Sequence, residues 1–221
     1  MILQSFPDRF SVFAESFEPD LSPKLEKLRL DAEREKIPII RREMQGFLRF
    51  LLHVRKPSRV LEIGSGIGFS ALFMLSCLEE IMELSDIHID SIEINPDHVR
   101  EATEHVSRFD ADKSINLIEG DACEELDQLI APYDFIFLDG PKAQYPLYLP
   151  KLIDLLNPGD MLVADNVLKE GEIIKSKYAV ERRQRTIHMR MREFLNQAMH
   201  DERLTSTVLS VGDGVCVSVR K

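Results

Sequence analysis

The chain has 221 residues, 44% of them hydrophobic and 30% charged, a composition typical of a folded globular domain that excludes a disordered or fibrous protein. Its formal net charge of −10 repels polyanions, so contact with nucleic acid would need a local cluster of basic residues. The charged N-terminal stretch and the lack of a long apolar run argue against a signal peptide or membrane span, so we expect one cytoplasmic domain over residues 1–221.

Residues 1–58 are expected to form an N-terminal helical segment. Ser22 and Pro23 are a typical helix start, with the serine as N-cap and the proline at the first helical position. Apolar residues then recur with helical spacing in two stripes, which are Leu25, Leu28 and Ala32, and Met44, Phe47, Leu48, Leu51 and Leu52. These helices either cover a sheet or bury a face in a second subunit, and we expect a homodimer.

A strand, a glycine turn and a helix follow in residues 59–70, RVLEIGSGIGFS. Gly64, Gly66 and Gly68 let the backbone approach a ligand, and the helix start offers free N–H groups. The spacing departs from the dinucleotide fingerprint G-x-G-x-x-G, which disfavours a nicotinamide oxidoreductase. Glu62 at the end of the strand suits the cationic, hydroxyl-rich S-adenosylmethionine better than a pyrophosphate. A plain turn or another nucleotide are the alternatives.

From residue 59 onward, short apolar runs alternate with helical patterns. The further strands are predicted at Ile87–Ile94, Ile115–Ile118, Tyr133–Leu138 and Met161–Ala164, with helices after Asn95, after Asp121, and from about Tyr145 to Asn157-Pro158-Gly159. This alternation predicts an α/β fold with a doubly wound, mostly parallel sheet, in which ligands bind at the carboxyl ends of the strands. The polar residues at those ends are Glu62, Glu93, Asp121, Asp139, Asp165 and Asn166.

The C-terminal part is expected to contain a long loop, a helix and a hairpin. Residues 167–180 have no clear periodicity, and loops of this length often act as lids or binding loops. A helix is predicted from Glu181 to about His200. Two apolar runs around Gly212-Asp213-Gly214, at Leu204–Val211 and Val215–Val219, predict a β-hairpin that places an antiparallel strand at the edge of the sheet.

Asp139, Asp165 and Asn166 offer oxygen ligands that favour Mg²⁺ or Ca²⁺, whereas the histidines are scattered without ligand spacing. The alternative is that Asp165 and Asn166 only cap their strand. Lys142 follows Asp139 by three residues, and near a bound cation its amine could accept a proton from a substrate hydroxyl. A solvated surface lysine is the alternative. Cys77, Cys123 and Cys216 form no C-x-x-C pair and are predicted to be reduced core residues.

The ordered motifs LEIGSGIGFS, SIEINPDH, IEGDA, FIFLDGPKAQY, LVADNVL and VGDG resemble the cation-dependent O-methyltransferases, which include catechol and caffeoyl-CoA O-methyltransferases. The resemblance covers about residues 37–219 and implies the Rossmann-like class I methyltransferase fold, with the core at 59–221. It implies that Mg²⁺ is held by Asp139, Asp165 and Asn166, and that Lys142 assists deprotonation beside Asp139. Its implied S-adenosylmethionine contacts are Ile40, Glu62, Gly64, Ser65, Gly66, Ser70, Glu93 at the ribose, Ala122 at the adenine, and Asp139.

One departure from the family pattern is Gly140-Pro141, where a small or acidic pair is expected. Within the family the chain is most similar to bacterial tRNA 5-hydroxyuridine methyltransferases, which implies methylation of the wobble base to 5-methoxyuridine. The basic residues that could contact tRNA phosphates are Lys175, Lys177, Arg182, Arg183, Arg185, Arg190 and Arg192. The alternatives are a small catechol-like or caffeoyl-CoA-like phenol as acceptor, a solvated helix face, and a non-catalytic protein that only binds the donor.

Overall fold

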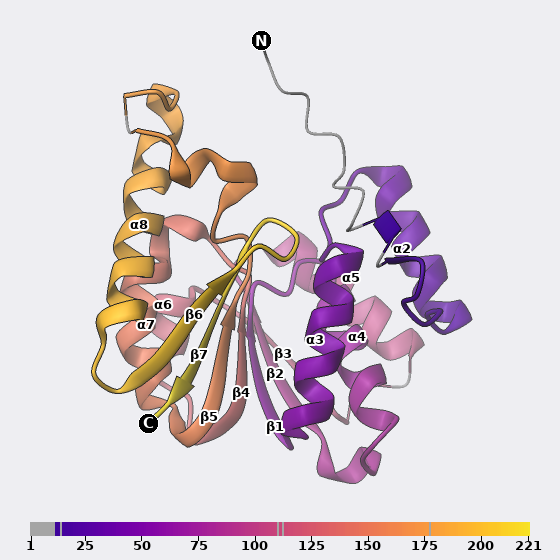
Figure 1. Ribbon diagram of the computed structural model, residues 1–221. Coiled ribbons are helices and arrows are strands. Elements are labelled where there is room, and N and C mark those ends of the chain that lie inside the picture. Colours follow the sequence, from indigo (N-terminus) through magenta and orange to yellow (C-terminus); the bar gives the residue numbers. More distant parts are fainter. Residues whose placement is uncertain (1–11, 14, 110, 112, 177) are drawn as a thin grey trace.

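The computed structural model describes residues 12–13, 15–109, 111, 113–176 and 178–221. Within this part, seven strands form one sheet in the order β3-β2-β1-β4-β5-β7-β6 (Figure 1). The strands are β1 (Arg59–Ile63), β2 (His88–Glu93), β3 (Ile115–Glu119), β4 (Tyr133–Leu138), β5 (Leu156–Ala164), β6 (Leu204–Leu209) and β7 (Val215–Arg220). Strands β1 to β5 run parallel, which confirms the Rossmann-like α/β fold.

The C-terminal hairpin is confirmed, and its strand β6, which pairs antiparallel with β7, forms the edge of the sheet as predicted. Strand β7 pairs antiparallel with both β5 and β6, so it lies inside the sheet and β6 forms the edge. The burial of the two strands explains the order. Val215 and Cys216 of β7 are both buried, on opposite faces, whereas β6 alternates between less and more exposed residues. An alternating strand suits the edge, and a strand with apolar residues on both faces suits the interior.

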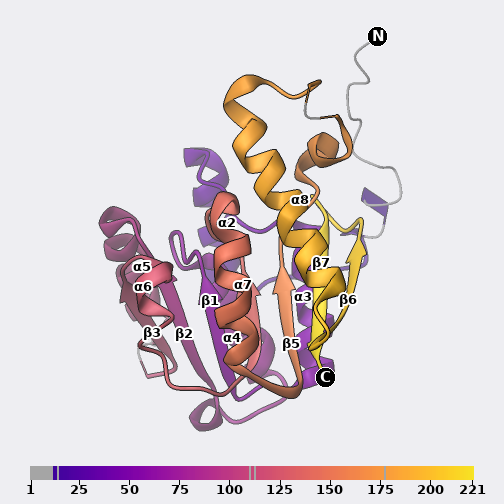
Figure 2. The ribbon, with the colours of Figure 1, turned by 90° about the vertical axis from the view of Figure 1, so that its left-hand side faces the viewer.

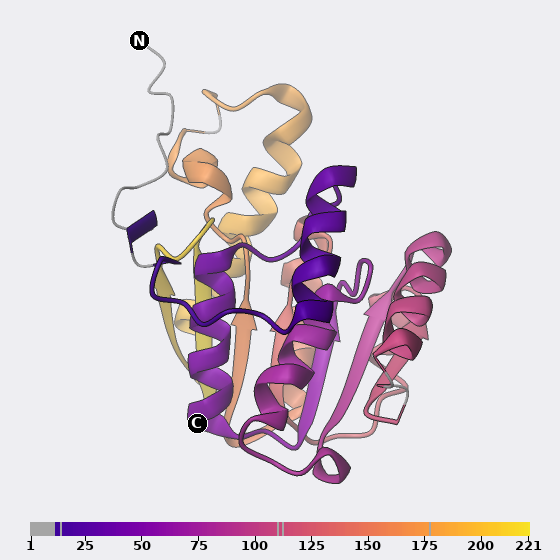
Figure 3. The same cartoon turned by 90° about the vertical axis from the view of Figure 1, so that its right-hand side faces the viewer.

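Helices cover both faces of the sheet. One layer contains α2 (Pro23–Glu35), α3 (Arg42–Arg55), α4 (Phe69–Glu79) and α5 (Pro96–Arg108), seen from its own side in Figure 3. The other contains α6 (Ala122–Glu125), α7 (Tyr145–Asp154) and α8 (Arg185–His200), of which α7 and α8 lie in front of the sheet in Figure 2. Short 3-10 helices occur at η1 (Leu84–Asp86), η2 (Lys142–Gln144), η3 (Lys169–Ile174) and η4 (Arg182–Gln184).

The N-terminal helices α2 and α3 pack over one face of the sheet. Of the two alternatives left open by the sequence, covering the sheet or burying a face in a second subunit, the structure shows the first. Leu25, Leu28 and Ala32 of α2 join the same buried cluster as Met44 and Leu48 of α3. That cluster also contains most of α4 and one face of the central strands. The predicted helix caps are confirmed as well, because the Ser22 hydroxyl accepts from the Leu25 amide at 3.4 Å.

The largest errors in the predicted boundaries are at the starts of α8 and β5. Helix α8 begins at Arg185 rather than Glu181, because the residues just before it form the 3-10 helix η4. Strand β5 begins at Leu156 rather than Met161 and includes Asn157-Pro158-Gly159. A β-bulge near the start of β5 explains the longer strand. Leu156 pairs with Tyr133 of β4, but the next pair is Met161 with Phe135, so the register shifts between them, and Gly159 in the intervening segment has φ +93°. An apolar run alone cannot reveal such a bulge.

The cysteines are free thiols, and Cys77 and Cys216 are buried as predicted, while Cys123 is only partly covered. Burial raises the pKa of the Cys77 thiol to about 12 and that of the Cys216 thiol to about 11. Such thiols stay protonated and unreactive near neutral pH. In the described ranges, the helices are too short or too polar for any of them to cross a lipid bilayer.

Candidate active site

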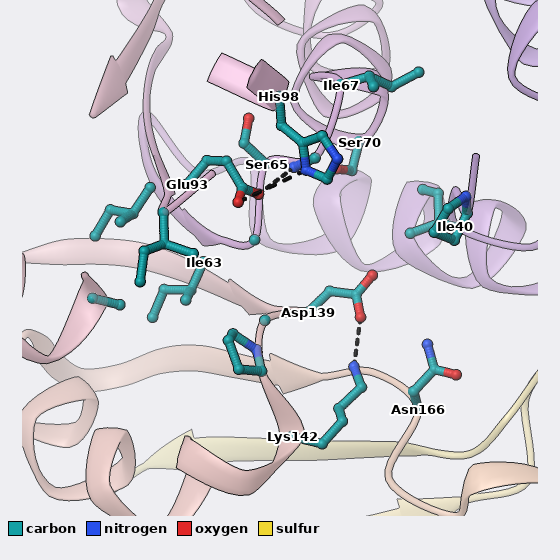
Figure 4. A pocket seen from close by; sticks show the side chains of 18 of the residues that line it. Ile40, Ile63, Ser65, Ile67, Ser70, Glu93, His98, Asp139, Lys142 and Asn166 are labelled. Atoms are coloured by element: carbon teal, nitrogen blue, oxygen red, sulfur yellow. Dashed lines mark hydrogen bonds and ion pairs between the residues drawn. The ribbon is translucent and has the colours of Figure 1, made fainter. Parts of the chain in front are cut away.

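The carboxyl ends of the parallel strands open into a cavity of about 520 Å³ (Figure 4). It is lined by most of the residues singled out in the sequence, which are Ile40, Gly64, Ser65, Gly66, Ser70, Glu93, Ala122, Asp139, Lys142 and Asn166. Glu62 and Asp165 are buried and lie outside this lining. The fold therefore gathers residues from six separate segments of the chain at one edge of the sheet, as the parallel topology predicts.

The glycine turn after β1 combines a close backbone contact with open space. Gly64 has φ +98°, and a Cβ there would lie 2.4 Å from the carbonyl oxygen of Asp139. Only glycine lets the ends of β1 and β4 approach this closely. Gly66 has φ +50°, and within the described part of the chain no atom lies within 4 Å of its would-be Cβ. The hydroxyl of Ser65 is buried and has no hydrogen-bond partner among the described residues, so the turn presents polar groups that a ligand can satisfy.

Glu93 is held at the end of β2 by two backbone amides. Its Oε2 accepts from the amide of Gly66 at 2.8 Å, and its Oε1 accepts from the amide of Asn95 at 2.9 Å. His98, in the first turn of α5, brings its Nδ1 to 3.9 Å from Oε1 and also lines the cavity (Figure 4). Each carboxylate oxygen retains a lone pair, so Glu93 can still accept from hydroxyl groups of a ligand.

Glu62 is a buried carboxylate beneath the cavity. Its Oε2 accepts from the hydroxyl of Ser91, while its Oε1 has no hydrogen-bond partner among the described residues. Burial is the main cause that raises the pKa of Glu62 to about 7. The charges of Asp139 and Glu93 act in the same direction, and nearby hydroxyls oppose them. An unsatisfied buried acceptor is costly, so this site favours a cationic or hydrogen-bond-donating group close by. Direct contact between Glu62 and the donor stays a prediction.

Asp139 and Asp165 leave adjacent strands at the same level. The Asp139 amide donates to Ile63 at 2.9 Å, and the Asp165 amide donates to Leu138 at 3.0 Å. These bonds continue the sheet ladder by one residue beyond each strand, which sets the two aspartates side by side. Asn166 follows with φ +60° and points into the cavity.

Asp165 is only 3% exposed. Burial raises its pKa to about 7, and the charge of Asp139 adds to that effect. The carboxylates of Asp139 and Asp165 and the amide oxygen of Asn166 are oxygen ligands that suit a hard divalent cation. A bound cation would also stabilise the anionic form of Asp165, which burial disfavours. The described residues contain no group of three or more His, Cys, Asp or Glu arranged as a metal site, so this mixed set is the candidate.

Lys142 points at the candidate cation site (Figure 4). Its Nζ donates to Asp139 Oδ1 at 2.6 Å, to the hydroxyl of Tyr145 at 2.8 Å and to the carbonyl of Asp165 at 3.2 Å. The unusual Gly140-Pro141 pair thus leaves the lysine beside Asp139. Tyr145 was missed by the sequence reasoning, although it stands three residues after Lys142 at the start of the next helix.

The segment after β5 closes one side of the cavity. Lys169 and Ile187 line the cavity, and neither was assigned to the site from the sequence. Lys169 Nζ donates to Gln184 at 2.5 Å and pairs with Glu172 at 3.0 Å, which ties η3 to η4. The basic residues Lys175, Arg182, Arg183 and Arg185 are exposed on the same segment, whereas Lys177 lies outside the described residues.

We predict that the ligand-free protein loses stability as pH rises from about 5 to 8. The folded pKa of Glu62 lies near 7 and its ordinary value is 4.5. Because the pKa is higher in the folded state, the folded protein binds more protons than the unfolded chain between these two pKa values. The stabilising contribution of protonated Glu62 is therefore complete below about pH 4.5 and is lost as the pH rises through about 7. Glu62 alone contributes about 3 kcal/mol of this loss, and Asp165 acts in the same direction.

Urea unfolding followed by circular dichroism, with chelator present, measures this effect at pH 5.5 and pH 8. Glu62→Gln is the matched control, since it keeps the shape of the side chain and removes its titration. The variant should show a smaller difference between the two pH values than the wild type. Equal free energies of unfolding for the wild type at both pH values would contradict the assignment.

Comparisons with known proteins identify the family of this chain. Residues 15–221 match the family model described as O-methyltransferase. The chain is 30% identical over 178 residues to tapetum-specific methyltransferase 1 of Arabidopsis thaliana, covering 79% of this chain and 74% of that protein. It is also 30% identical to the caffeoyl-CoA O-methyltransferase of Medicago sativa, covering 79% and 71% of the two chains.

Among solved structures, the methyltransferase PaMTH1 of Podospora anserina, crystallised with S-adenosylhomocysteine bound, superposes with a TM-score of 0.84. The two share 26% sequence identity, and the match covers 97% of this chain and 94% of that one. The family match and the fold agree. The chain therefore belongs to the O-methyltransferase family and is an S-adenosylmethionine-dependent O-methyltransferase.

Proposed function

We propose that this enzyme methylates a hydroxyl group with a vicinal oxygen and uses a divalent cation, Mg²⁺, held by Asp139, Asp165 and Asn166. The observation that carries the proposal is that buried Asp165 follows the strand next to that of Asp139 and directly precedes Asn166, and that Asp139 and Asn166 line the same cavity as the glycine turn. Bound there, the cation would lower the pKa of the substrate hydroxyl and orient the two vicinal oxygens.

Lys142 is the residue best placed to handle the proton of the substrate hydroxyl. Its amine lies within hydrogen-bond distance of Asp139 and of the Tyr145 hydroxyl. Tyr145 is fixed in turn, because its hydroxyl donates to the carbonyl of Leu138 at 2.9 Å. This network holds the ammonium next to the candidate cation ligands, where it would stabilise the oxyanion, and where its neutral form, after loss of a proton, would accept the proton of the substrate hydroxyl.

The opposite wall of the cavity suits S-adenosylmethionine. Glu93, fixed by two amides, is placed to accept from the ribose hydroxyls, and Ala122 and Ile40 offer apolar surface for the adenine side. Gly66 and the unpartnered hydroxyl of Ser65 leave room and a polar group for the methionine part. Fixing the donor opposite the hydroxyl lowers the barrier by positioning, with effective molarities of ~10⁵ M or more for well-oriented groups.

The acceptor we favour is 5-hydroxyuridine at the tRNA wobble position, whose O4 and O5 are vicinal. The supporting feature is a basic surface, defined as Lys175, Arg182, Arg183 and Arg185, on the segment that closes the cavity. These residues are exposed and positive on a chain whose net charge is −10. Phosphate contacts from such a surface would hold an RNA while one base enters the cavity.

A small catechol-like or caffeoyl-CoA-like phenol is the second candidate. It is favoured by the names of similar proteins, among them the Medicago sativa caffeoyl-CoA O-methyltransferase. Internal ion pairs also count in its favour, because Arg183 pairs with Glu181 at 2.8 Å and Arg190 with Glu193 at 3.0 Å. Those arginines are partly neutralised within the chain itself.

Transfer of a labelled methyl group from S-adenosylmethionine tests both acceptors side by side. The substrates are tRNA containing 5-hydroxyuridine and a simple catechol, each with Mg²⁺ and with chelator. Chelator-sensitive labelling of the tRNA alone would support the favoured acceptor, and labelling of the catechol alone would support the second. Labelling of either substrate that chelator does not reduce would overturn the cation assignment.

Charge reversal of the basic surface should separate RNA binding from chemistry. We expect Arg182→Glu, Arg183→Glu and Arg185→Glu together to lower kcat/KM for tRNA by at least about a hundredfold, because phosphate contacts are lost. Affinity for S-adenosylhomocysteine should stay within about twofold. The matched control reverses Lys56, Arg108 and Lys113, which are exposed at the other end of the strands. Unchanged tRNA kinetics in the first variant would remove the basic surface from the proposal.

A further inference from the structure

The turn between β6 and β7, residues 211–214, binds the backbone that follows the candidate cation ligands. This turn is the yellow loop that joins β6 and β7 in Figure 1. The amide of Val167 donates to the carbonyl of Gly214 at 2.9 Å. The amides of Leu168 and Lys169 both donate to the carbonyl of Asp213, at 2.9 and 3.2 Å. Three consecutive amides after the last candidate ligand are thus held by one turn.

These bonds carry the pairing of β5 and β7 past the ends of the two strands. Ala164 pairs with Cys216 in the antiparallel ladder, and the same register places Asn166 opposite Gly214. Asn166 has φ +60°, a left-handed conformation that residues other than glycine adopt uncommonly. Such a conformation persists only where the surrounding structure imposes it. The turn supplies that constraint directly beside the residue.

Gly214 is the point of closest contact. Its φ is +86°, and a Cβ there would lie 2.3 Å from Cγ of Leu168. Any larger residue would push residues 167–169 away from the turn. Gly212, two residues earlier, has φ +53°, but no atom of the described residues lies within 4 Å of its would-be Cβ. The two glycines therefore share a positive φ and differ in whether a side chain would collide.

The same turn also contacts the donor side of the cavity. The carboxylate of Asp213 pairs with the guanidinium of Arg41 at 2.8 Å. Arg41 is the N-cap of α3 and directly follows Ile40, which lines the cavity. One turn thus connects the segment around Ile40 with the segment around Asn166, on two walls of the same cavity.

We propose that the 211–214 turn positions the cation site, with Gly214 and the carbonyl of Asp213 holding Asn166 in place and the Arg41–Asp213 ion pair tying this wall to the donor wall. The inference rests on the proposed function, because it needs Asn166 to be a cation ligand. Asp213 and Gly214 are positioning residues, since they act through Asn166. Groups that orient metal ligands typically change metal affinity by about 10- to 100-fold when removed.

The test compares Gly214→Ala with Gly212→Ala as the matched control. Mn²⁺ is the probe, and its binding is measured by electron paramagnetic resonance in the absence of donor. Binding of S-adenosylhomocysteine is measured by calorimetry in chelator. We expect Gly214→Ala to weaken Mn²⁺ binding at least about tenfold and to leave S-adenosylhomocysteine affinity within about twofold. Gly212→Ala should change neither affinity by more than about twofold.

A second pair of variants tests the ion pair without a steric change. Asp213→Asn and Arg41→Gln should each weaken Mn²⁺ binding, and the double variant should be no weaker than the single ones, because both remove one interaction. Additive effects would overturn this part of the inference. Equal Mn²⁺ affinity in Gly214→Ala and Gly212→Ala would overturn the role of the turn and leave the proposed function intact.

Two further outcomes are distinguishable. A Gly214→Ala variant that loses S-adenosylhomocysteine binding along with Mn²⁺ would show a general structural role and overturn the positioning role. A wild type that binds S-adenosylhomocysteine but no Mn²⁺ would overturn the proposed cation site itself, and the inference with it.

Discussion

Replacing Asp165 by asparagine is expected to lower kcat/KM for methyl transfer by about a thousandfold, the scale seen when one positioned charge-stabilising group is removed. The ligand-free variant should be at least as stable as the wild type. Asparagine keeps the shape of the side chain and removes a buried carboxylate whose ionisation burial and the charge of Asp139 oppose. Initial rates with Mg²⁺ and thermal melting in chelator measure the two effects.

Asp160→Asn is a matched control on the same strand. Asp160 is also buried, with its pKa raised by burial, but it lies in the middle of β5, outside the lining of the cavity, and pairs with Arg55 at 2.6 Å. Its substitution should leave activity nearly unchanged and reduce stability, because the Arg55 guanidinium loses its partner. The two variants should therefore show opposite patterns. Full activity of Asp165→Asn in Mg²⁺ would refute the assignment of Asp165 as a cation ligand.

Gly64→Ala should be the most disruptive change in the glycine turn. The added Cβ would lie 2.4 Å from the backbone oxygen of Asp139, and φ is +98°. Adopting positive φ costs an alanine about 1–2 kcal/mol, and separating β1 from β4 adds about 1–3 kcal/mol of overpacking. We expect a loss of about 2–5 kcal/mol in the free energy of unfolding, with weaker donor binding, because the same shift moves Asp139.

Two other glycines separate these contributions. Gly159 has φ +93°, and none of the atoms that the structure describes lies within 4 Å of its would-be Cβ, so Gly159→Ala should show the conformational cost alone. Gly66 is equally unobstructed but lines the cavity, so Gly66→Ala should weaken S-adenosylhomocysteine binding with a small loss of stability. Urea unfolding and calorimetry distinguish the three. A Gly64→Ala variant as stable as Gly159→Ala would show that the close approach of Gly64 to Asp139 does not affect the free energy of unfolding.

Local sequence patterns were sufficient for most of the secondary structure. The stripe of Leu25, Leu28 and Ala32 predicted α2, and the run Tyr133–Leu138 matches β4 residue for residue. These features depend on periodicity and capping within a few residues, so the sequence encodes them directly. The boundaries of α8 and β5 were wrong because a 3-10 turn and a bulge have no comparable periodic signal.

The candidate site was predictable for a related reason. A residue that follows a parallel strand lies at the carboxyl edge of the sheet whatever the order of the strands. Glu93, Asp139 and Asn166 could therefore be assigned to one cavity from their positions after apolar runs, and the structure brings them there. The family resemblance added roles to residues such as Ile40 and Ala122, which no local pattern distinguishes.

By itself, then, the sequence determined the strands, the glycine turn and the set of polar residues at the strand ends, because each depends on neighbours along the chain. Only the tertiary structure decided that β7 enters between β5 and β6, that Lys142 bonds to Asp139, and that Gly214 packs on Leu168. Strand order and side-chain packing join residues that are distant in the chain. Such contacts follow from burying both faces of the sheet at once, and no local pattern specifies them.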